Sequence, residues 1–368
     1  MKICISVTND IVTDQRVNRI ARSLTHLSDD IWIIGRREKN SPELKDSGIK
    51  FRRFSLLFNR GPLFYLCYNT SLFFHLLFHR YDILVANDLD TLPANFIISG
   101  LKRKILVYDS HEYFTEVPEL VNRKTVKRVW EFIERLIVPH VKHAYTVCDS
   151  LAEIYSTKYG INMIAIRNLP YLSRDLNQVV KPELTREKII LYQGSVNIGR
   201  GLELVIKAMQ YIDDAVFWII GEGDITDNLR KLVLKSGLES RVVFFGRMLP
   251  ENLKLYTLRA GVGISLEENM GLNYYYALPN KLFDYINSCV PVLVSDFPEM
   301  GQLVRKYNIG VTTLTTDPQK LAEILRKMLN DQEQIRRWKS NLKKAALELC
   351  WEKEESKLIG FYRQIISP

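Results

Sequence analysis

The sequence predicts an α/β protein made of two Rossmann-like, doubly wound domains with a cleft between them. The chain has 368 residues, which is more than a single hydrophobic core usually serves. Short runs of branched apolar residues alternate with helical patterns, which is typical of parallel sheets covered by helices. The runs form two sets, and the stretch 168–184 between them has two prolines and no clear period, as expected of a linker.

The first set of strand-like runs predicts a domain over residues 1–167. Its runs are KICISVT, DIWIIGR, YDILVAN, KILVYDS and AYTVC. The stretch 61–79 has no Lys, Arg, Asp or Glu, but Asn69, Thr70 and Ser71 interrupt it, so it falls short of a transmembrane helix. The stretch 122–145 mixes basic and apolar residues, as in a helix that covers a sheet or rests on anionic lipid.

The second set predicts a domain over residues 185–349. Its runs are KIILYQG, AVFWIIG, RVVFFG, GVGISL and VPVLVS. The final segment, 350–368, is helical in pattern and has the apolar residues to dock on a surface. We expect it to form a helix that packs back on the first domain.

Composition narrows the class of protein and the partners it could have. The five cysteines are scattered and never spaced as C-x-x-C, which argues against a disulfide framework or a zinc site. The opening MKICISVTND lacks the long apolar core and cleavage site of a signal peptide, which favours a protein of the reducing cytosol. The net charge of +9 favours anionic partners, whether membrane lipids, nucleic acid or phosphorylated substrates.

Glycine-rich turns follow three strands of the second predicted domain. In chain order the turns carry Gly194, Gly199, Arg200, Gly201, Gly221, Glu222 and Gly246. Glycines let a backbone approach phosphate closely, and an arginine beside a helix N-terminus adds a fixed cation. The alternative for each turn is an ordinary connection between a strand and a helix.

A helix with two charges in its first turns follows Pro279. Asn280 begins it, and Lys281 and Asp284 come next. A cation and a carboxylate at the start of a helix beside a strand end would hold a phosphate and a sugar hydroxyl. The alternative is a solvated ion pair between the two side chains.

Ionisable residues also end strands of the first domain. His111 and Glu112 follow KILVYDS, and His111 is either a packed residue or a contact to a reacting group. Asp14 and Arg16 follow the first strand, where Asp14 is placed to cap a helix that begins near Gln15.

Two further pairs in the first domain have the spacing of metal ligands. Asp88 and Asp90 form NDLD, but we expect Asp88 to cap the following helix or meet an acceptor, and Asp90 to stay solvated. His75 and His79 lie four residues apart without the glutamate of a zinc protease helix. We interpret this histidine pair as part of an aromatic packing face.

Together these motifs resemble the nucleotide-sugar-dependent glycosyltransferases of the GT-B architecture, in particular the retaining group called glycosyl transferases group 1, or family 4. The segments that carry the resemblance are GSVNIGRGLELVIKAM, IGEGD, VVFFGRM and PNKLFDYINSCVPVLVSD, and more weakly NDIVTDQRVNRIARSL and VYDSHEY. The resemblance implies a UDP- or GDP-sugar as co-substrate, no metal or other cofactor and no nucleic-acid partner.

The resemblance also implies roles for individual residues. Arg200 and Lys281 would hold the donor diphosphate and, with His111 beside the transferring sugar, form the catalytic set. The residues implied to bind the donor are Gly194, Ser195, Gly199, Arg200, Gly221, Glu222, Gly246, Asn280, Lys281 and Asp284. Those implied on the acceptor side are Asp14, Arg16, Asp88 and Glu112.

The chain departs from the family pattern at two positions. Ser195 stands where many members have an arginine, and Tyr276 stands where the first glutamate of the E-x7-E pattern falls. Glu267 and Glu268 lie upstream and would substitute for that glutamate if the loop between them is reshaped.

The implied function is transfer of a sugar with retention to a glycan or lipid-linked acceptor, in cell-surface polysaccharide synthesis. The implied place is the cytoplasm, including the inner face of the cytoplasmic membrane, where an anionic surface would be a partner. A nucleotide-sugar epimerase on the same fold and a non-catalytic binding protein are the alternatives. A nicotinamide dehydrogenase is disfavoured, because no glycine follows the first strand.

Overall fold

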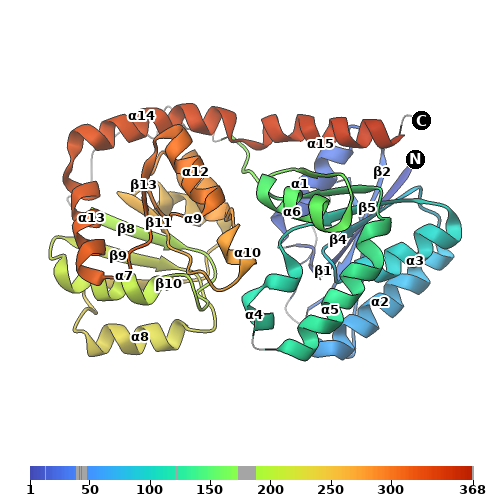
Figure 1. The fold of residues 1–368 in the computed structure, drawn as a ribbon, viewed down its shortest axis with the longest axis horizontal. Helices are drawn as coiled ribbons and strands as arrows, with labels where there is room; N and C mark the ends of the chain where they lie inside the picture. Colours follow the sequence, from blue (N-terminus) through green and yellow to red (C-terminus); the bar gives the residue numbers. More distant parts are fainter. Residues whose placement is uncertain are drawn as a thin grey trace. The chain divides into compact units, whose positions relative to one another are not determined.

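The computed structural model describes residues 1–12, 14–38, 41, 43, 48–121, 123–172 and 188–366, and it confirms an α/β fold with two parallel sheets (Figure 1). The chain divides into two compact units, Met1–Asn168 with Glu354–Pro368, and Leu169–Lys353. Most of the predicted linker, from residue 173 onward, lies outside the described residues.

The first unit contains a seven-stranded parallel sheet in the order β3-β2-β1-β4-β5-β6-β7. Its strands are β1 (Lys2–Asp10), β2 (Asp30–Arg36), β3 (Lys50–Phe54), β4 (Ile83–Asn87), β5 (Ile105–Ser110), β6 (His143–Thr146) and β7 (Met163–Ala165). The strand order reverses between β1 and β4, where Ile5 pairs with Val85. Ligands of such sheets bind beyond the carboxyl ends of the strands at this reversal.

Helices pack over the sheet of the first unit and on one another. They are α1 (Gln15–Leu24), α2 (Gly61–Phe78), α3 (Leu92–Lys102), α4 (Pro118–Val121), α5 (Lys124–Ile137) and α6 (Asp149–Tyr159), with 3-10 turns at Phe114–Glu116 and Val138–His140. In α2, the buried residues Phe64, Tyr68, Leu72 and Leu76 recur every four positions. Tyr68, Leu72 and Leu76 share a core cluster with Ile98 of α3.

The second unit contains a six-stranded parallel sheet in the order β10-β9-β8-β11-β12-β13. Its strands are β8 (Lys188–Gln193), β9 (Ala215–Ile220), β10 (Val242–Gly246), β11 (Val262–Ser265), β12 (Val292–Ser295) and β13 (Gly310–Thr313). Its order reverses between β8 and β11, so a ligand site is expected beyond the ends of these two strands.

The helices of the second unit include the two that the sequence predicts after Gly201 and Pro279. They are α7 (Leu202–Ala208), α8 (Thr226–Lys235), α9 (Pro250–Thr257), α10 (Leu272–Tyr275), α11 (Asn280–Asn287), α12 (Pro298–Tyr307), α13 (Pro318–Asn330) and α14 (Gln332–Glu348), with a 3-10 turn at Met209–Tyr211. The last helix, α15 (Trp351–Ile366), belongs to the first unit from Glu354 onward, and its Tyr362 packs against Tyr145 of β6.

The ten predicted strands are confirmed, but the sequence missed β3, β7 and β13. All three lie at a sheet edge. An edge strand has only one neighbour and is partly exposed, so it needs no continuous apolar run, and KFRRF of β3 carries three basic residues. Within the part of the chain that the structure describes, no helix is both long and apolar enough to span a membrane.

Candidate functional site

The glycines at the strand ends of the second unit allow neighbouring backbones to come close together. Gly201 has a φ of +69°, and a Cβ there would lie 2.3 Å from the carbonyl oxygen of Leu266. A Cβ on Gly221, whose φ is +141°, would lie 1.8 Å from the carbonyl oxygen of Gly194. These two glycines are therefore required by packing, because any larger residue would push the ends of neighbouring strands apart.

A fully buried carboxylate, Glu267, joins the two predicted phosphate-binding cations. Glu267 follows β11, and its Oε1 lies 2.7 Å from Lys281 Nζ at the start of α11 and 3.3 Å from Arg200 Nη1 in the turn after β8. Its Oε2 accepts a hydrogen bond of 2.8 Å from Ser265 Oγ. The structure thus brings Arg200 and Lys281 together at the reversal point of the sheet.

Two tyrosine rings complete the surroundings of these cations. The guanidinium of Arg200 lies 4.4 Å from the centre of the Tyr274 ring, and Lys281 Nζ lies 4.4 Å from the centre of the Tyr192 ring. Sequence analysis assigned neither ring to the site, although Tyr192 lies in the predicted strand KIILYQG, two residues before Gly194. It noted Glu267 only as a substitute for a missing glutamate, and its position at the end of a buried strand was the signal that could have identified it.

The charges of this cluster do not cancel. Burial lowers the pKa of Lys281 to about 8, against the opposing effect of Glu267, so the ammonium is still largely charged at neutral pH. Burial alone would raise the pKa of Glu267, but Lys281 and Arg200 hold it below its usual value. Two cations and one carboxylate sum to +1, which suits an anionic ligand.

The other predicted donor residues lie around this cluster with different partners. Asp284, one turn along α11, accepts a hydrogen bond of 3.0 Å from Gln193 Nε2 at the end of β8. Asn280 and Ser195 are exposed, and the Ser195 carbonyl accepts a hydrogen bond from Tyr192. Tyr276 directly follows α10 as its C-cap and packs on Tyr275.

Glu222 and Gly246 mark the ends of β9 and β10, further along the sheet from the reversal point. Glu222 lies 3.8 Å from Arg230 of α8, and the Gly246 carbonyl accepts a hydrogen bond from the Gly221 amide. Glu268 follows Glu267, and burial raises the pKa of its carboxyl group. Glu222 and Gly246 therefore lie beside the cation cluster, at the ends of the two strands that follow β8 in the sheet.

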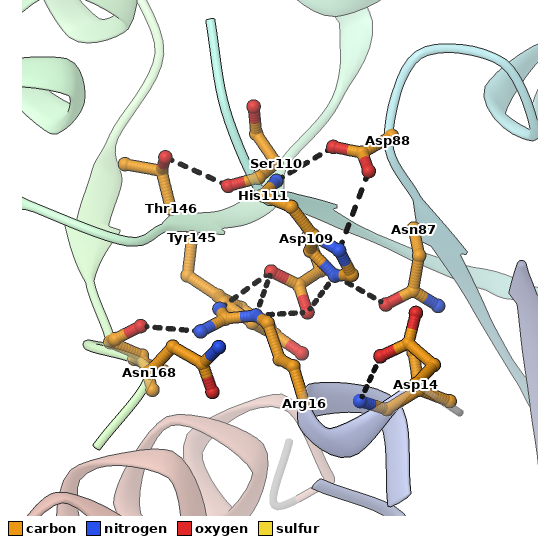
Figure 2. Close-up of polar contacts among 12 residues, drawn as sticks. Asp14, Arg16, Asn87, Asp88, Asp109, Ser110, His111, Tyr145, Thr146 and Asn168 are labelled. Carbon is orange, nitrogen blue, oxygen red and sulfur yellow. Dashed lines mark hydrogen bonds and ion pairs between the residues drawn. The ribbon is translucent and has the colours of Figure 1, made fainter. Parts of the chain in front are cut away.

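In the first unit, His111 is held by carboxylates on both sides of its ring (Figure 2). Its Nε2 lies 3.2 Å from Asp109 Oδ2 and 3.1 Å from Asn87 Oδ1, and its Nδ1 lies 3.4 Å from Asp88 Oδ2. Burial opposes protonation, but Asp88 and Asp109 outweigh it and raise the pKa of His111 to about 9. These neighbours favour the imidazolium form of the ring, which donates hydrogen bonds from both of its nitrogens, while burial raises the pKa of Asp88 to about 8.

Arg16 and Asp14 have local partners in the same region. Arg16 is buried, and its Nη2 lies 2.7 Å from Asp109 Oδ1 while its Nη1 donates to the carbonyl of Ile166 (Figure 2). Asp14 caps α1 by accepting a hydrogen bond of 3.0 Å from the Val17 amide, as predicted. Glu112 is half-buried, and its carbonyl accepts a hydrogen bond from Ser110.

One prediction for the NDLD turn is wrong, and one of the two alternatives for Asp88 is excluded. Asp90 is buried rather than solvated, and its Oδ2 accepts a hydrogen bond of 2.6 Å from Thr8 Oγ1. Asp88 does not cap α3, whose N-cap is Thr91; instead its Oδ1 accepts a hydrogen bond of 2.7 Å from the His111 amide. Asp88 has a φ of +58°, so the turn bends in a way that helix-start rules do not anticipate.

The histidine pair of α2 lies among aromatic rings. His75 contacts Phe54 with ring centroids 6.0 Å apart and hydrogen-bonds Tyr81, and His79 stacks on His75. Burial lowers the pKa of His75 to about 4. Among the residues that the structure describes, no group of three or more His, Cys, Asp or Glu side chains is arranged to hold a metal ion.

Comparison with known proteins relates part of the sequence to glycosyltransferases. Residues 173–345 match the family model described as Glycosyl transferases group 1. A stretch of 183 residues is 26% identical to a protein of Methanocaldococcus jannaschii named uncharacterized glycosyltransferase. This match covers 48% of the chain and 45% of that protein, so it spans less than half of the relative's length.

Solved structures of low sequence identity share the fold along nearly the whole chain. Sucrose-phosphate synthase of Thermosynechococcus elongatus has a TM-score of 0.78 at 17% identity, over 100% of this chain and 99% of that chain. HepE of Anabaena, solved with UDP-glucose, has a TM-score of 0.74 at 15% identity, over 100% of both chains. WaaG, a glycosyltransferase involved in lipopolysaccharide biosynthesis, has a TM-score of 0.70 at 15% identity, over 96% of this chain and 98% of that chain. The chain therefore has the GT-B fold.

Proposed function

We propose that this chain, whose residues 173–345 match the Glycosyl transferases group 1 model, transfers a sugar from a nucleoside-diphosphate sugar to a glycan or lipid-linked acceptor. We further propose that the anomeric configuration is retained and that the product belongs to a cell-surface polysaccharide. The GT-B fold and the family match support glycosyl transfer. The neighbouring structure of HepE, which contains UDP-glucose, supports a nucleotide-sugar donor, and we favour a UDP- or GDP-sugar.

The observation that carries the proposal is the surplus positive charge around Glu267. In the proposed reaction Arg200 and Lys281 bind the donor diphosphate and stabilise it as it departs with its new negative charge. The first turn of α11 adds backbone amides, since no side chain among the described residues caps this helix. Asp284 would accept a hydrogen bond from a ribose hydroxyl.

The proposed role of the first unit is to bind hydroxyl groups of sugars. His111 donates hydrogen bonds as an imidazolium, and the carboxyl oxygens of Asp88 and Glu112 accept them. Because Asp88 and Asp109 favour the protonated ring, we assign His111 to binding and charge stabilisation rather than to proton abstraction. Catalysis would then consist of positioning the two substrates and neutralising the leaving diphosphate.

Thermal-shift measurements with UDP-, GDP-, ADP- and TDP-sugars test the donor, followed by NMR of the product formed with an acceptor. We expect one donor to raise the melting temperature by several degrees, and Lys281→Ala to abolish that shift. Arg337→Ala, which removes an exposed arginine of α14, serves as the control. Failure of every donor to shift the wild-type protein would overturn the proposal. Conversion of a donor into its epimer without an acceptor would replace glycosyl transfer by epimerisation.

A further inference from the structure

We propose that the outward face of α2, α3 and α5 binds the surface of an anionic lipid bilayer. The three helices lie next to one another in the first unit (Figure 1). Tyr65 of α2 meets Trp130 of α5 with ring centroids 5.0 Å apart, and Lys102 of α3 donates hydrogen bonds to the last carbonyls of α2. Their outward sides therefore form one surface, which we call the α2/α3/α5 face.

Large apolar side chains gather on this face. Phe78 of α2 is 77% exposed, Leu101 of α3 is 66% exposed and Phe132 of α5 is 65% exposed. The other exposed apolar residues of the three helices are Leu63, Leu66, Phe74, Ile97, Val129 and Leu136. Scattered apolar residues are normal on a protein surface, but a gathering on three adjacent helices marks an interaction surface.

The two sides of α2 show that core packing does not account for its apolar composition. Its buried stripe already supplies the contacts to the sheet, and the opposite stripe of Leu63, Leu66, Phe74 and Phe78 faces outward. The rings of Phe74 and Phe78 stack with centroids 6.4 Å apart. A helix that is apolar on both sides requires a second apolar environment in addition to the core.

Basic residues at the ends of the helices and along α5 select an anionic partner. Arg60 precedes α2, Arg80 lies shortly after it, Arg103 follows α3, and Arg128 and Arg135 lie on α5. In the described part of the chain, no ion pair is found for Arg60, Arg80, Arg103 or Arg128. Their guanidinium groups are exposed and can bind lipid phosphates.

On α5, at one end of the α2/α3/α5 face, apolar and basic side chains lie side by side. Arg128, Phe132, Arg135 and Leu136 line an open hollow on α5 together with Glu131, which pairs with Arg135. An apolar floor beside guanidinium groups matches the boundary between acyl chains and phosphate headgroups.

A second copy of the chain fits this face less well than a bilayer does. In a two-fold symmetric dimer each face meets an identical one, so the arginines of both copies would be brought together. Such a contact would bury like charges against each other. An anionic bilayer instead neutralises these arginines and receives the apolar side chains between them.

Sedimentation of the full chain with vesicles tests the proposal. We expect binding to phosphatidylcholine vesicles that contain about 30 mol% phosphatidylglycerol, and much weaker binding to pure phosphatidylcholine. Exchanging both Arg103→Gln and Arg128→Gln should weaken binding about fivefold per residue, since one basic residue near an anionic surface contributes about 1 kcal/mol. Binding should also fall as the salt concentration rises from ~0.05 M to ~0.5 M.

A triple variant, Phe78→Glu, Leu101→Glu and Phe132→Glu, tests the apolar part of the face. We expect it to lose vesicle binding while it keeps its melting temperature and its donor-induced thermal shift. Leu234→Glu with Leu255→Glu is the matched control, because these leucines are equally exposed on α8 and α9 of the second unit. The proposal is overturned if the wild-type chain does not bind anionic vesicles, or if the control loses as much binding as the triple variant. Self-association that the triple variant abolishes, without vesicle binding, would show instead that the face joins two copies. Because vesicle binding needs no donor, it can fail while the proposed glycosyl transfer stands.

Discussion

Lys281 Nζ lies 2.7 Å from Glu267 Oε1, and this carboxylate is fully buried between Lys281 and Arg200. Removing the negative charge would leave two cations next to each other without a counter-ion. Both the stability of the second unit and its proposed binding of diphosphate therefore depend on Glu267.

Glu267→Gln keeps the shape of this side chain and removes its charge. We expect the free energy of unfolding to fall by about 3 kcal/mol, as is typical when one partner of a buried ion pair is lost. Urea denaturation measures the change. Glu131→Gln, which breaks the exposed pair with Arg135, is the control and should change stability by less than about 0.5 kcal/mol. Equal free energies of unfolding for the two variants would contradict the proposed contribution of Glu267 to stability.

Arg200→Ala and Lys281→Ala should each lower kcat/KM by about 30-fold to 1000-fold, or about 2 to 4 kcal/mol of transition-state stabilisation. The physical reason is the loss of a charge-assisted contact to the departing diphosphate. Asp284→Asn should chiefly weaken nucleotide binding. Steady-state kinetics and donor titrations separate the two effects, with Arg337→Ala as an exposed control. Wild-type turnover and donor affinity in all three variants would disprove the site.

His111 and His75 should titrate on opposite sides of the usual histidine pKa of 6.5. Burial lowers the pKa of His75 to about 4, whereas Asp88 and Asp109 raise that of His111 to about 9 despite burial. NMR titration of histidine ring signals measures both values, and His111→Gln and His75→Gln assign them. Asp109→Asn should move the His111 titration to lower pH. A titration of His111 near 6.5 in the wild-type protein would refute its assignment as an imidazolium.

The raised pKa of His111 also predicts a pH dependence of stability. Because the folded protein holds the proton more tightly than the unfolded chain, protonation stabilises the fold. The contribution is complete below about pH 6.5 and is lost as the pH rises through about 9. The stability difference between the wild-type protein and His111→Gln should therefore shrink over this window. Urea denaturation at several pH values shows whether it does.

Turnover should not require a divalent metal, because Arg200 and Lys281 already provide the positive charge that a cation would bring to the diphosphate. Excess EDTA should leave the rate within about twofold, a change of ~0.4 kcal/mol. Activity assays with and without EDTA measure this. Inhibition that manganese restores, together with loss of donor binding in Asp88→Ala, would show that NDLD is the metal site and that our assignment is mistaken.

Features that depend on neighbours in the sequence were predictable from the sequence. The continuous apolar runs of β1, β4, β5, β8 and β11 predict central parallel strands, because such strands are covered by helices on both faces of the sheet. The cap of α1 at Asp14 and the start of α11 at Asn280 follow from rules that reach only a few residues along the chain. The glycine-rich turns, together with Arg200 and Lys281, also indicated where in the second unit the candidate donor site lies.

Contacts between distant segments could not be predicted in the same way. Asp90 looks like a solvated residue at a helix start, yet it is buried and accepts a hydrogen bond from Thr8, which lies 82 positions earlier. Glu267 meets Arg200 and Lys281 only because the strand order places the ends of β8 and β11 and the start of α11 together. The sequence by itself determined which segments form strands and helices, since that choice depends on local periodicity. Only the tertiary structure decided which charges face each other, because parallel strands place side by side residues that are separated by an entire crossover connection.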